Sequence, residues 1–173
     1  MMSEKMNNVT VRRFCMMKDI SEPMLVYHGG SEIIMNPEIR IDKYAKDFYF
    51  GFYCTVLPTQ AERWAMRNIN KSIVNVYKFT ANSNLNIKYF NEMTDEWLDF
   101  IAMCRNGGSH GYDIVEGPMA DDVIYNYVQD FIDNKISRSA FWELAKFRYP
   151  THQISFHSAR ALECLTYERS YSL

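Results

Sequence analysis

Runs of apolar residues along the chain predict strands near both of its ends. Alternating or continuous β-branched and aromatic side chains are typical of buried strands, because they pack well on a pleated surface. Segments with this pattern are residues 24–28, 48–56, 73–79 and 153–157, with shorter ones at 85–90 and 112–115. We expect the first strand to stop at Gly29-Gly30 and the strand at 112–115 to end before Gly117-Pro118.

Apolar residues at helical spacing predict helices in the middle of the chain. Pro58 suits the first turn of a helix that carries Ala61, Trp64 and Ala65 on one face, so Trp64 should face inward. Two further helices should begin at residues that can cap helix N-termini, Thr94 and Ser137. A third should open at Asp121-Asp122, because acidic residues suit the positive end of a helix. Residues 159–165 predict a short helix or the approach to another strand.

This order of elements predicts the fold class and the domain organisation. Strands near both ends with helices grouped between them indicate an α+β fold and not an alternating parallel sheet. A chain of 173 residues is long enough to bury a core and cover a cleft. We expect one domain over residues 24–173, after a loosely attached lead-in over residues 1–23 that ends at the break Ser21-Glu22-Pro23.

The charge balance and the cysteines narrow the class of function. The 19 Lys and Arg residues against 21 Asp and Glu residues give no basic field, so a nucleic-acid partner is not indicated, although it is not excluded. The four cysteines lack C-x-x-C spacing, which favours reduced thiols over a zinc site or a disulfide framework. No apolar run is long enough for a membrane span, and we expect a cytoplasmic protein without a membrane partner.

Several motifs that resemble chemical sites are better explained by structure. Residues 107–111, GGSHG, lack the Lys-Ser/Thr of a phosphate-binding loop. The histidines His110, His152 and His157 lack metal-ligand spacing, so we predict no metal. Asp121-Asp122 suits the positive end of a helix better than a catalytic acid pair.

A more specific pattern joins a histidine, a tyrosine and a tryptophan. The segment VYHGG ends the first strand at His28, GFYCT places Tyr53 25 positions later, and Trp64 follows eleven positions after Tyr53 on the predicted helix. The nicotinamide of NAD is a flat cation that leaves as a neutral ring, so two aromatic faces such as Tyr53 and Trp64 suit it. A glycine beside His28 lets a dinucleotide lie against the backbone, where the His28 ring donates to a ribose hydroxyl.

These motifs, in this order, resemble the diphtheria-toxin and poly(ADP-ribose) polymerase branch of the ADP-ribosyltransferases. That branch carries H-G-[ST] at the end of a strand, G-[FI]-Y-[SFA] in a second strand and an aromatic residue eleven positions later. The segments YHGGS, DFYFGFYCT, QAERWA, YDIVEGPMADD and HQISFHSARAL also resemble the bacterial family called domain of unknown function 3990. The resemblance covers nearly all of the chain after the lead-in. It implies split antiparallel sheets with flanking helices, and NAD as co-substrate of a mono-ADP-ribosyltransferase.

The same resemblance assigns site residues. It puts His28 on the adenine ribose, Gly29 on nicotinamide and Tyr53 in the stack, with Gln153 at the position of the family's catalytic glutamate. The resulting catalytic candidates are His28, Tyr53 and Gln153, and the NAD-binding candidates are Tyr27, His28, Gly29, Tyr53, Thr55 and Trp64. The resemblance further implies a toxin-like effector of macromolecules with a neutralising antitoxin protein.

Two positions depart from the family pattern. Gln153 hydrogen-bonds but brings no negative charge to a developing cation, which argues against chain elongation. It leaves transfer to an acceptor that needs no base, a carboxylate supplied by another residue, or no catalysis; the carboxylate candidates are Asp113, Glu116 and Asp121. Tyr49 stands where the related D-F-G-x-G-F-Y pattern has glycine, which affects the rim of the cleft.

Other functions compete with ADP-ribosyl transfer. A catalytically degenerate module that binds NAD or another nucleotide and a protein partner is the main alternative, and Gln153 supports it. A transferase that removes a 2′-phosphate from RNA with NAD shares the fold in outline, but the near-neutral charge speaks against it. The acceptor, whether protein, nucleic acid or water, stays open.

Overall fold

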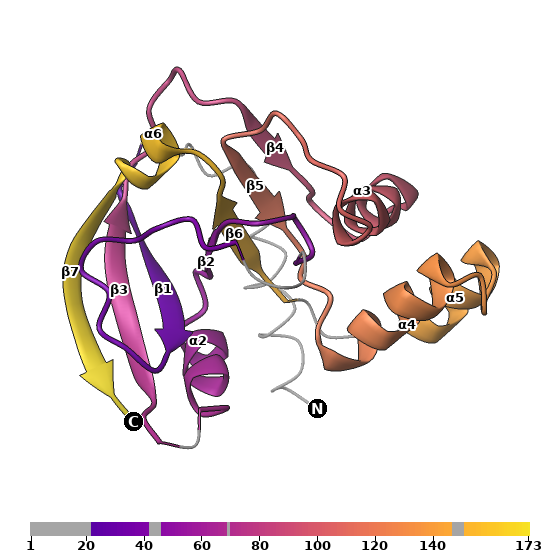
Figure 1. Ribbon diagram of the computed structural model, residues 1–173, viewed down its shortest axis with the longest axis horizontal. Coiled ribbons are helices and arrows are strands. Elements are labelled where there is room, and N and C mark those ends of the chain that lie inside the picture. Colours follow the sequence, from indigo (N-terminus) through magenta and orange to yellow (C-terminus); the bar gives the residue numbers. More distant parts are fainter. Residues whose placement is uncertain (1–21, 42–45, 69, 147–150) are drawn as a thin grey trace, which may run out of the picture.

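The computed structural model describes residues 22–41, 46–68, 70–146 and 151–173. These residues form an α+β fold with two mostly antiparallel sheets and five helices (Figure 1). The α+β prediction is therefore confirmed. Residues 1–21, which make up most of the predicted lead-in, lie outside the described residues.

The first sheet contains three antiparallel strands in the order β1-β3-β7. They are β1 (Met24–Gly30), β3 (Ile73–Phe79) and β7 (Leu165–Ser172). The central strand β3 is buried at every position except Lys78, because it has neighbours on both edges. The continuous apolar run that predicted this strand reflects that burial.

The second sheet contains four strands in the order β2-β6-β5-β4. They are β2 (Phe52–Cys54), β6 (Gln153–Phe156), β5 (Ile114–Gly117) and β4 (Ile87–Tyr89). The pairs β2·β6 and β5·β6 are antiparallel, whereas β4 and β5 run parallel. Chain segments far apart in sequence thus lie side by side in this sheet.

The helices begin at the residues that the sequence indicates. They are α2 (Pro58–Ala65), α3 (Asp95–Arg105), α4 (Asp122–Ile132), α5 (Arg138–Ala145) and α6 (Ala159–Leu162). Pro58 lies in the first turn of α2, and the side chains of Thr94 and Ser137 cap α3 and α5 as predicted. The helix α4 starts where predicted, and the Asp121 side chain caps it. Each of these caps accepts a hydrogen bond from a backbone N–H that has no partner inside its own helix.

The second sheet has a different apolar cluster on each face. Phe52, Ile154 and Phe156 pack with Val26, Tyr77 and Phe79 of the first sheet in a core between the two sheets. The opposite face carries Tyr53 and Val115, which pack with residues of α3, α4 and α5. In Figure 1 these three helices lie on the far side of the second sheet from the first. The alternation along β2 therefore sends Phe52 and Tyr53 into different cores.

Several predicted boundaries were wrong. The strand β1 continues through Gly29-Gly30, because both glycines pair with β3. The predicted strand 48–56 is reduced to Phe52–Cys54, because the preceding segment forms a loop in which Tyr49 has a φ of 73°. The strand predicted at 112–115 is shifted to Ile114–Gly117. The edge strand β7 was missed, since its sequence LTYERSYS mixes apolar and charged residues.

Candidate functional site

The two sheets meet where β1 approaches the end of β2. Tyr27 and Thr55 exchange two backbone hydrogen bonds of 2.8 and 2.9 Å. Thr55 is fully buried, and its hydroxyl accepts a hydrogen bond from the Leu57 N–H just before α2. The side chain of Tyr27 packs against Ala61 and Ala65 of α2. Both residues therefore hold the junction together through contacts within the protein.

His28 spans this junction. Its Nδ1 lies 2.7 Å from the backbone carbonyl oxygen of Tyr53, and its ring stacks on Phe52 with centroids 4.6 Å apart. A carbonyl only accepts, so Nδ1 carries the proton. Burial lowers the pKa of His28, which favours the neutral ring.

The other ring nitrogen of His28 is Nε2. Within the described part of the chain no group hydrogen-bonds Nε2, and every buried side-chain nitrogen or oxygen there has a partner, so Nε2 is accessible. In the neutral ring this atom is a hydrogen-bond acceptor. The sequence suggested a donor toward a ribose hydroxyl; the geometry gives an acceptor from that hydroxyl instead.

Gly29 has two separate structural features. A Cβ added there would lie 2.0 Å from the Ala61 carbonyl oxygen, so glycine is required for α2 to pack against β1. Its backbone groups point elsewhere. In an antiparallel ladder alternate residues turn their N–H and C=O to opposite edges, and Tyr27 turns both toward Thr55. Gly29, two residues later, therefore presents its N–H and C=O at the same edge of β1.

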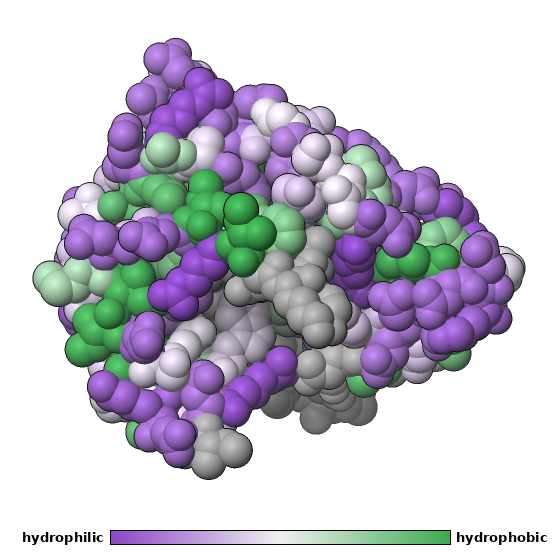
Figure 2. All heavy atoms as spheres, in the orientation of Figure 1, coloured by the Kyte–Doolittle hydropathy of each residue, from purple (hydrophilic) through white to green (hydrophobic). Residues whose placement is uncertain are grey.

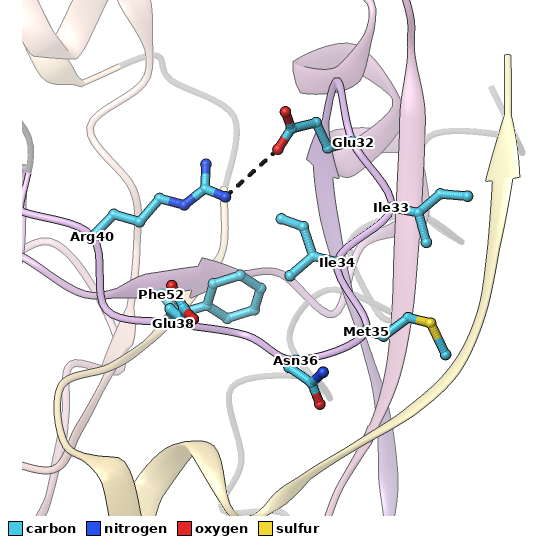
Figure 3. Close-up of a pocket in the computed structure, with 8 residues that line it drawn as sticks. All are labelled: Glu32, Ile33, Ile34, Met35, Asn36, Glu38, Arg40 and Phe52. Carbon is cyan, nitrogen blue, oxygen red and sulfur yellow. Dashed lines mark ion pairs between the residues drawn. The ribbon is translucent and has the colours of Figure 1, made fainter.

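A pocket of about 310 Å³ lies against Phe52 of β2. It is formed by the loop after β1 together with Phe52, the residue on which the His28 ring stacks. Arg40 and Glu32 form an ion pair at its rim, with nitrogen and oxygen 3.6 Å apart, and Phe52 points toward Ile34 (Figure 3). The pocket thus combines an aromatic wall with two acidic side chains, Glu32 and Glu38, and one basic side chain, Arg40.

The loop that forms this pocket is also apolar on its outer side. Ile33 and Met35 are 56% and 62% exposed, and Ile41 is 80% exposed. Figure 2 shows apolar side chains gathered on the face of the molecule that this loop crosses. The mouth of the pocket is therefore bordered by apolar surface.

Tyr53 is largely enclosed. It is 8% exposed, and its ring makes a T-shaped contact with the His157 ring. Its hydroxyl accepts a hydrogen bond from the Phe48 N–H at 3.1 Å and donates one to the Tyr49 carbonyl at 2.6 Å. The Lys46 ammonium lies 5.1 Å from the ring centroid, so one face of the ring already receives a cation.

Trp64 does not take the fully inward position that the spacing predicted. Its side chain is partly exposed, whereas its neighbours Ala61 and Ala65 are fully buried. Among the ring pairs of the described residues none joins Trp64 to Tyr53. The structure thus brings Tyr53 and His28 together through the backbone, but it does not form the ring-to-ring clamp between Tyr53 and Trp64.

Two histidines fasten the loop before β2. His110 Nε2 lies 3.0 Å from the Phe48 carbonyl oxygen, and His157 Nδ1 lies 2.8 Å from that of Phe50. Burial lowers the pKa of His157 to about 4, so its ring is neutral near pH 7. Tyr49 lies in the left-handed region at φ 73°, which explains why the related pattern has glycine there.

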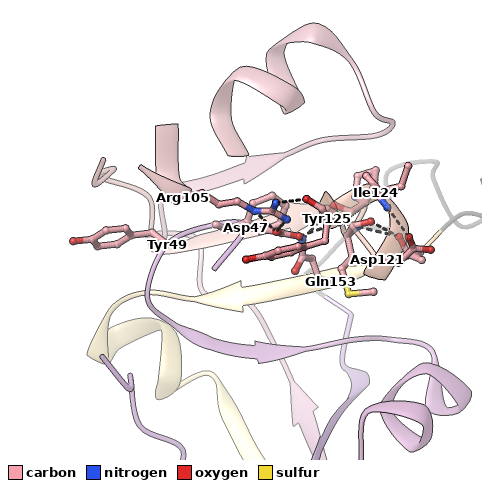
Figure 4. Close-up of polar contacts among 12 residues, drawn as sticks. Asp47, Tyr49, Arg105, Asp121, Ile124, Tyr125 and Gln153 are labelled. Carbon is pink, nitrogen blue, oxygen red and sulfur yellow. Dashed lines mark hydrogen bonds and ion pairs between the residues drawn. The ribbon is translucent and has the colours of Figure 1, made fainter. Parts of the chain in front are cut away.

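Gln153 is buried and contacts the carboxylate of Asp47, which was not among the residues predicted for the site. Its Nε2 lies 3.2 Å from Asp47 Oδ2 and 3.3 Å from the Pro118 carbonyl oxygen. Asp47 is itself buried, with 7% of its surface exposed. It forms an ion pair with Arg105, whose Nε donates to it at 3.0 Å, and it accepts a second hydrogen bond from the Ala120 N–H at 2.9 Å (Figure 4). The nearest negative charge to Gln153 is therefore that of Asp47, balanced by Arg105.

The three carboxylates proposed from the sequence have other partners. Asp113 is buried and bonds Arg160, Ser158 and the Asn86 N–H, and the Arg160 guanidinium lowers its pKa to about 2. Asp121 caps α4. Glu116 accepts from His152 Nε2 at 3.0 Å, while His152 Nδ1 accepts from the Val56 N–H. Of the three, only Glu116 has a partly exposed side chain that does not serve a cap or an arginine pair.

The residues missed from the sequence were Asp47, Arg105 and the pocket loop. A signal for Asp47 was present, because it is the one acid that opens the aromatic run DFYFGFYC. Arg105 stands at the end of a helix, where its charge is also explained by the helix dipole. Within the described ranges we find no cluster of metal-ligating side chains and no helix long and apolar enough to cross a membrane.

A family model described as protein of unknown function (DUF3990) matches residues 24–167, from the start of β1 into β7. A search of curated proteins finds no match.

Proposed function

Because this chain belongs to the DUF3990 family, whose model covers residues 24–167, we propose that it is an NAD-dependent mono-ADP-ribosyltransferase with an ADP-ribosyltransferase-like split-sheet fold. The single observation that carries this proposal is the arrangement of His28 and Gly29 at the edge of β1. There an accessible imidazole nitrogen, a backbone N–H and a backbone C=O lie within two consecutive residues.

These groups match the polar groups of an NAD molecule. The nicotinamide carboxamide can donate through its NH₂ to the C=O of a residue such as Gly29 and accept through its oxygen from the N–H of the same residue. A ribose hydroxyl donates to His28 Nε2. The Phe52 wall and the Arg40 guanidinium of the adjacent pocket suit the flat and the anionic parts of a dinucleotide.

The aromatic residues contribute to the nicotinamide end in this proposal. Trp64, partly exposed on α2, supplies a ring face for nicotinamide, and Tyr53 already attracts a cation to its ring. Tyr53 also holds the His28 tautomer through its backbone carbonyl. Burial and the nearby Asp47 raise the pKa of Tyr53 well above its usual value, so the hydroxyl stays protonated.

The reaction requires little proton chemistry from the protein. When bound, NAD supplies the ADP-ribosyl group, and nicotinamide leaves with the electron pair of its bond to ribose. The acceptor nucleophile then bonds the ribose C1′ and releases its proton to solvent. Gln153 is suited to accept a hydrogen bond from a ribose hydroxyl, and this contact orients the sugar without adding charge.

A second candidate function is NAD binding without turnover. It is favoured by the neutral amide of Gln153 and by the full pairing of Asp47 with Arg105, which together leave little uncompensated negative charge for an oxocarbenium-like transition state. Such a module would still use His28 and Gly29. Free nicotinamide distinguishes the two functions, because only the transferase releases it.

The biological setting rests on the family resemblance. We propose a toxin-like effector that modifies a macromolecule and is neutralised by an antitoxin protein. The apolar loop at residues 33–41 beside the pocket is a natural place for either macromolecule to contact the protein.

The test is incubation of purified protein with NAD, with and without cell extract, while free nicotinamide and protein- or nucleic-acid-linked ADP-ribose are measured. We expect nicotinamide release that increases with extract. A matched control is Gly111→Ala, because a Cβ there meets nothing within 4 Å. Absence of nicotinamide, of labelled product and of calorimetric NAD binding in the wild-type protein would overturn the proposal.

A further inference from the structure

We propose that Asp47 is a positioning residue that fixes the orientation of the Gln153 amide, with its carbonyl oxygen turned toward the ribose of bound NAD. This inference rests on the proposed function, because it assigns the ribose as the partner of that oxygen. It adds to that function the residue that compensates for the missing glutamate.

The orientation of the amide follows from its neighbours. Both groups near one end of the Gln153 amide, Asp47 Oδ2 and the Pro118 carbonyl, are acceptors, so this end is Nε2 and its two hydrogens face them. The Pro118 carbonyl is itself fixed by the Trp97 indole N–H at 2.9 Å. The amide is therefore not free to flip.

The same contacts do not use the carbonyl oxygen of Gln153. In the described part of the protein no group donates a hydrogen bond to Oε1. The side chain is otherwise buried, with 3% of its residue exposed. A buried glutamine held in this way presents one acceptor atom in a defined direction.

Asp47 is itself held rigidly. Arg105 and the Ala120 N–H bond different oxygens of its carboxylate, and Arg105 also donates to the Tyr125 carbonyl and stacks on the Tyr125 ring at 3.9 Å. In Figure 4 Asp47 lies between Arg105 and Gln153, while the Tyr49 ring points away from them. The chain from α3 through Asp47 to Gln153 thus consists of charge-assisted hydrogen bonds, which are shorter and stronger than neutral ones.

The proposal can be tested by exchanging the carboxylate and the amide. Gln153→Glu alone places a carboxylate against Asp47 and the Pro118 carbonyl, whereas D47N/Q153E keeps one carboxylate and one amide in contact with each other, with their positions exchanged. The control D113N/Q153E removes a buried, arginine-paired carboxylate that does not contact Gln153. Each variant is first checked for cooperative unfolding.

The first measurement is stability against pH and needs no NAD. In Q153E the negative charge of Asp47 should raise the folded-state pKa of the introduced carboxyl group, while the positive charge of Arg105 opposes this rise. The Tyr53 hydroxyl and the Cys104 thiol stay neutral, because burial raises the pKa of each. A raised folded pKa means that stability is lost as pH rises through that pKa. We expect this loss in Q153E and D113N/Q153E but not in D47N/Q153E. An unchanged loss in D47N/Q153E would overturn the contact.

The second measurement is nicotinamide release. We expect D47N to lower kcat about tenfold or more with KM changed less than about threefold, because a mispositioned acceptor acts mainly on the transition state. D47N/Q153E should restore turnover that Q153E loses, and D113N/Q153E should not. A D47N protein with wild-type kcat would overturn the positioning role. A wild-type protein that fails to bind NAD would instead overturn the proposed function, even if the first measurement confirms the contact.

Discussion

His28 Nδ1 lies 2.7 Å from the backbone carbonyl oxygen of Tyr53, and this hydrogen bond joins a strand of one sheet to a strand of the other. The two residues are 25 positions apart in the sequence. The bond selects the tautomer in which Nε2 accepts, so the functional state of His28 depends on how the two sheets meet. Any change that moves β1 relative to β2 should therefore affect the site.

The first prediction concerns the packing of α2 on β1. Gly29→Ala should destabilise the protein by about 3 kcal/mol or more, because the added methyl overlaps the Ala61 carbonyl oxygen and a backbone group cannot move aside cheaply. Gly111→Ala, where a Cβ meets nothing within 4 Å, should change the free energy of unfolding by less than about 0.5 kcal/mol. Urea denaturation of both variants checks this. Equal stabilities would show that α2 does not approach β1 so closely.

The second prediction concerns the left-handed backbone of Tyr49. Tyr49→Gly should be more stable than Tyr49→Ala by about 1 kcal/mol, because both variants lose the ring and only alanine keeps the cost of a positive φ. The comparison between the two variants removes the contribution of the ring contacts with Phe50 and His110. Thermal unfolding measures it, and a more stable alanine variant would mean that Tyr49 does not adopt this conformation.

The third prediction concerns acid sensitivity. His157 has a pKa of about 4 in the folded protein, whereas an unfolded histidine has about 6.5. Below pH 6.5 the unfolded state therefore binds the proton first, so stability is complete above that pH and is lost toward pH 4. His157→Gln should remove about 2 kcal/mol of the stability difference between pH 7 and pH 5. Denaturation curves at the two pH values test this, and an unchanged difference would mean that folding does not lower the pKa of His157.

Much of the fold could be predicted from local sequence signals. The caps at Thr94 and Ser137, the acidic helix start at Asp121 and the proline at Pro58 each act within one helical turn, and all four were placed correctly. The buried strand β3 was also clear, because two neighbouring strands force apolar residues along its whole length. The strand predicted to begin at residue 48 was wrong in its first part, because the carbonyls of Phe48 and Phe50 accept hydrogen bonds from His110 and His157. These histidines come from distant parts of the chain.

The residues of the candidate site likewise fall into those that a local motif indicates and those that only the fold brings together. The motif YHGG indicated His28 and Gly29 as neighbours on one strand, which is a local property. The pairing of Gln153 with Asp47 joins residues 106 positions apart, and no local pattern reports such a contact. Likewise, the eleven-residue spacing from Tyr53 to Trp64 predicted two facing rings, but β2 turns Tyr53 into the helical core while Trp64 stays on α2.

Binding of NAD through His28 is tested by a calorimetric titration of NAD into the wild-type protein and into His28→Phe. Phenylalanine keeps a ring to stack on Phe52 but removes both nitrogens, so a similar melting temperature would show that the fold is retained. We expect saturable binding to the wild-type protein and an affinity at least about tenfold lower in the variant, since a hydrogen bond and its orientation are lost. Equal affinities, or no binding by the wild-type protein, would contradict it.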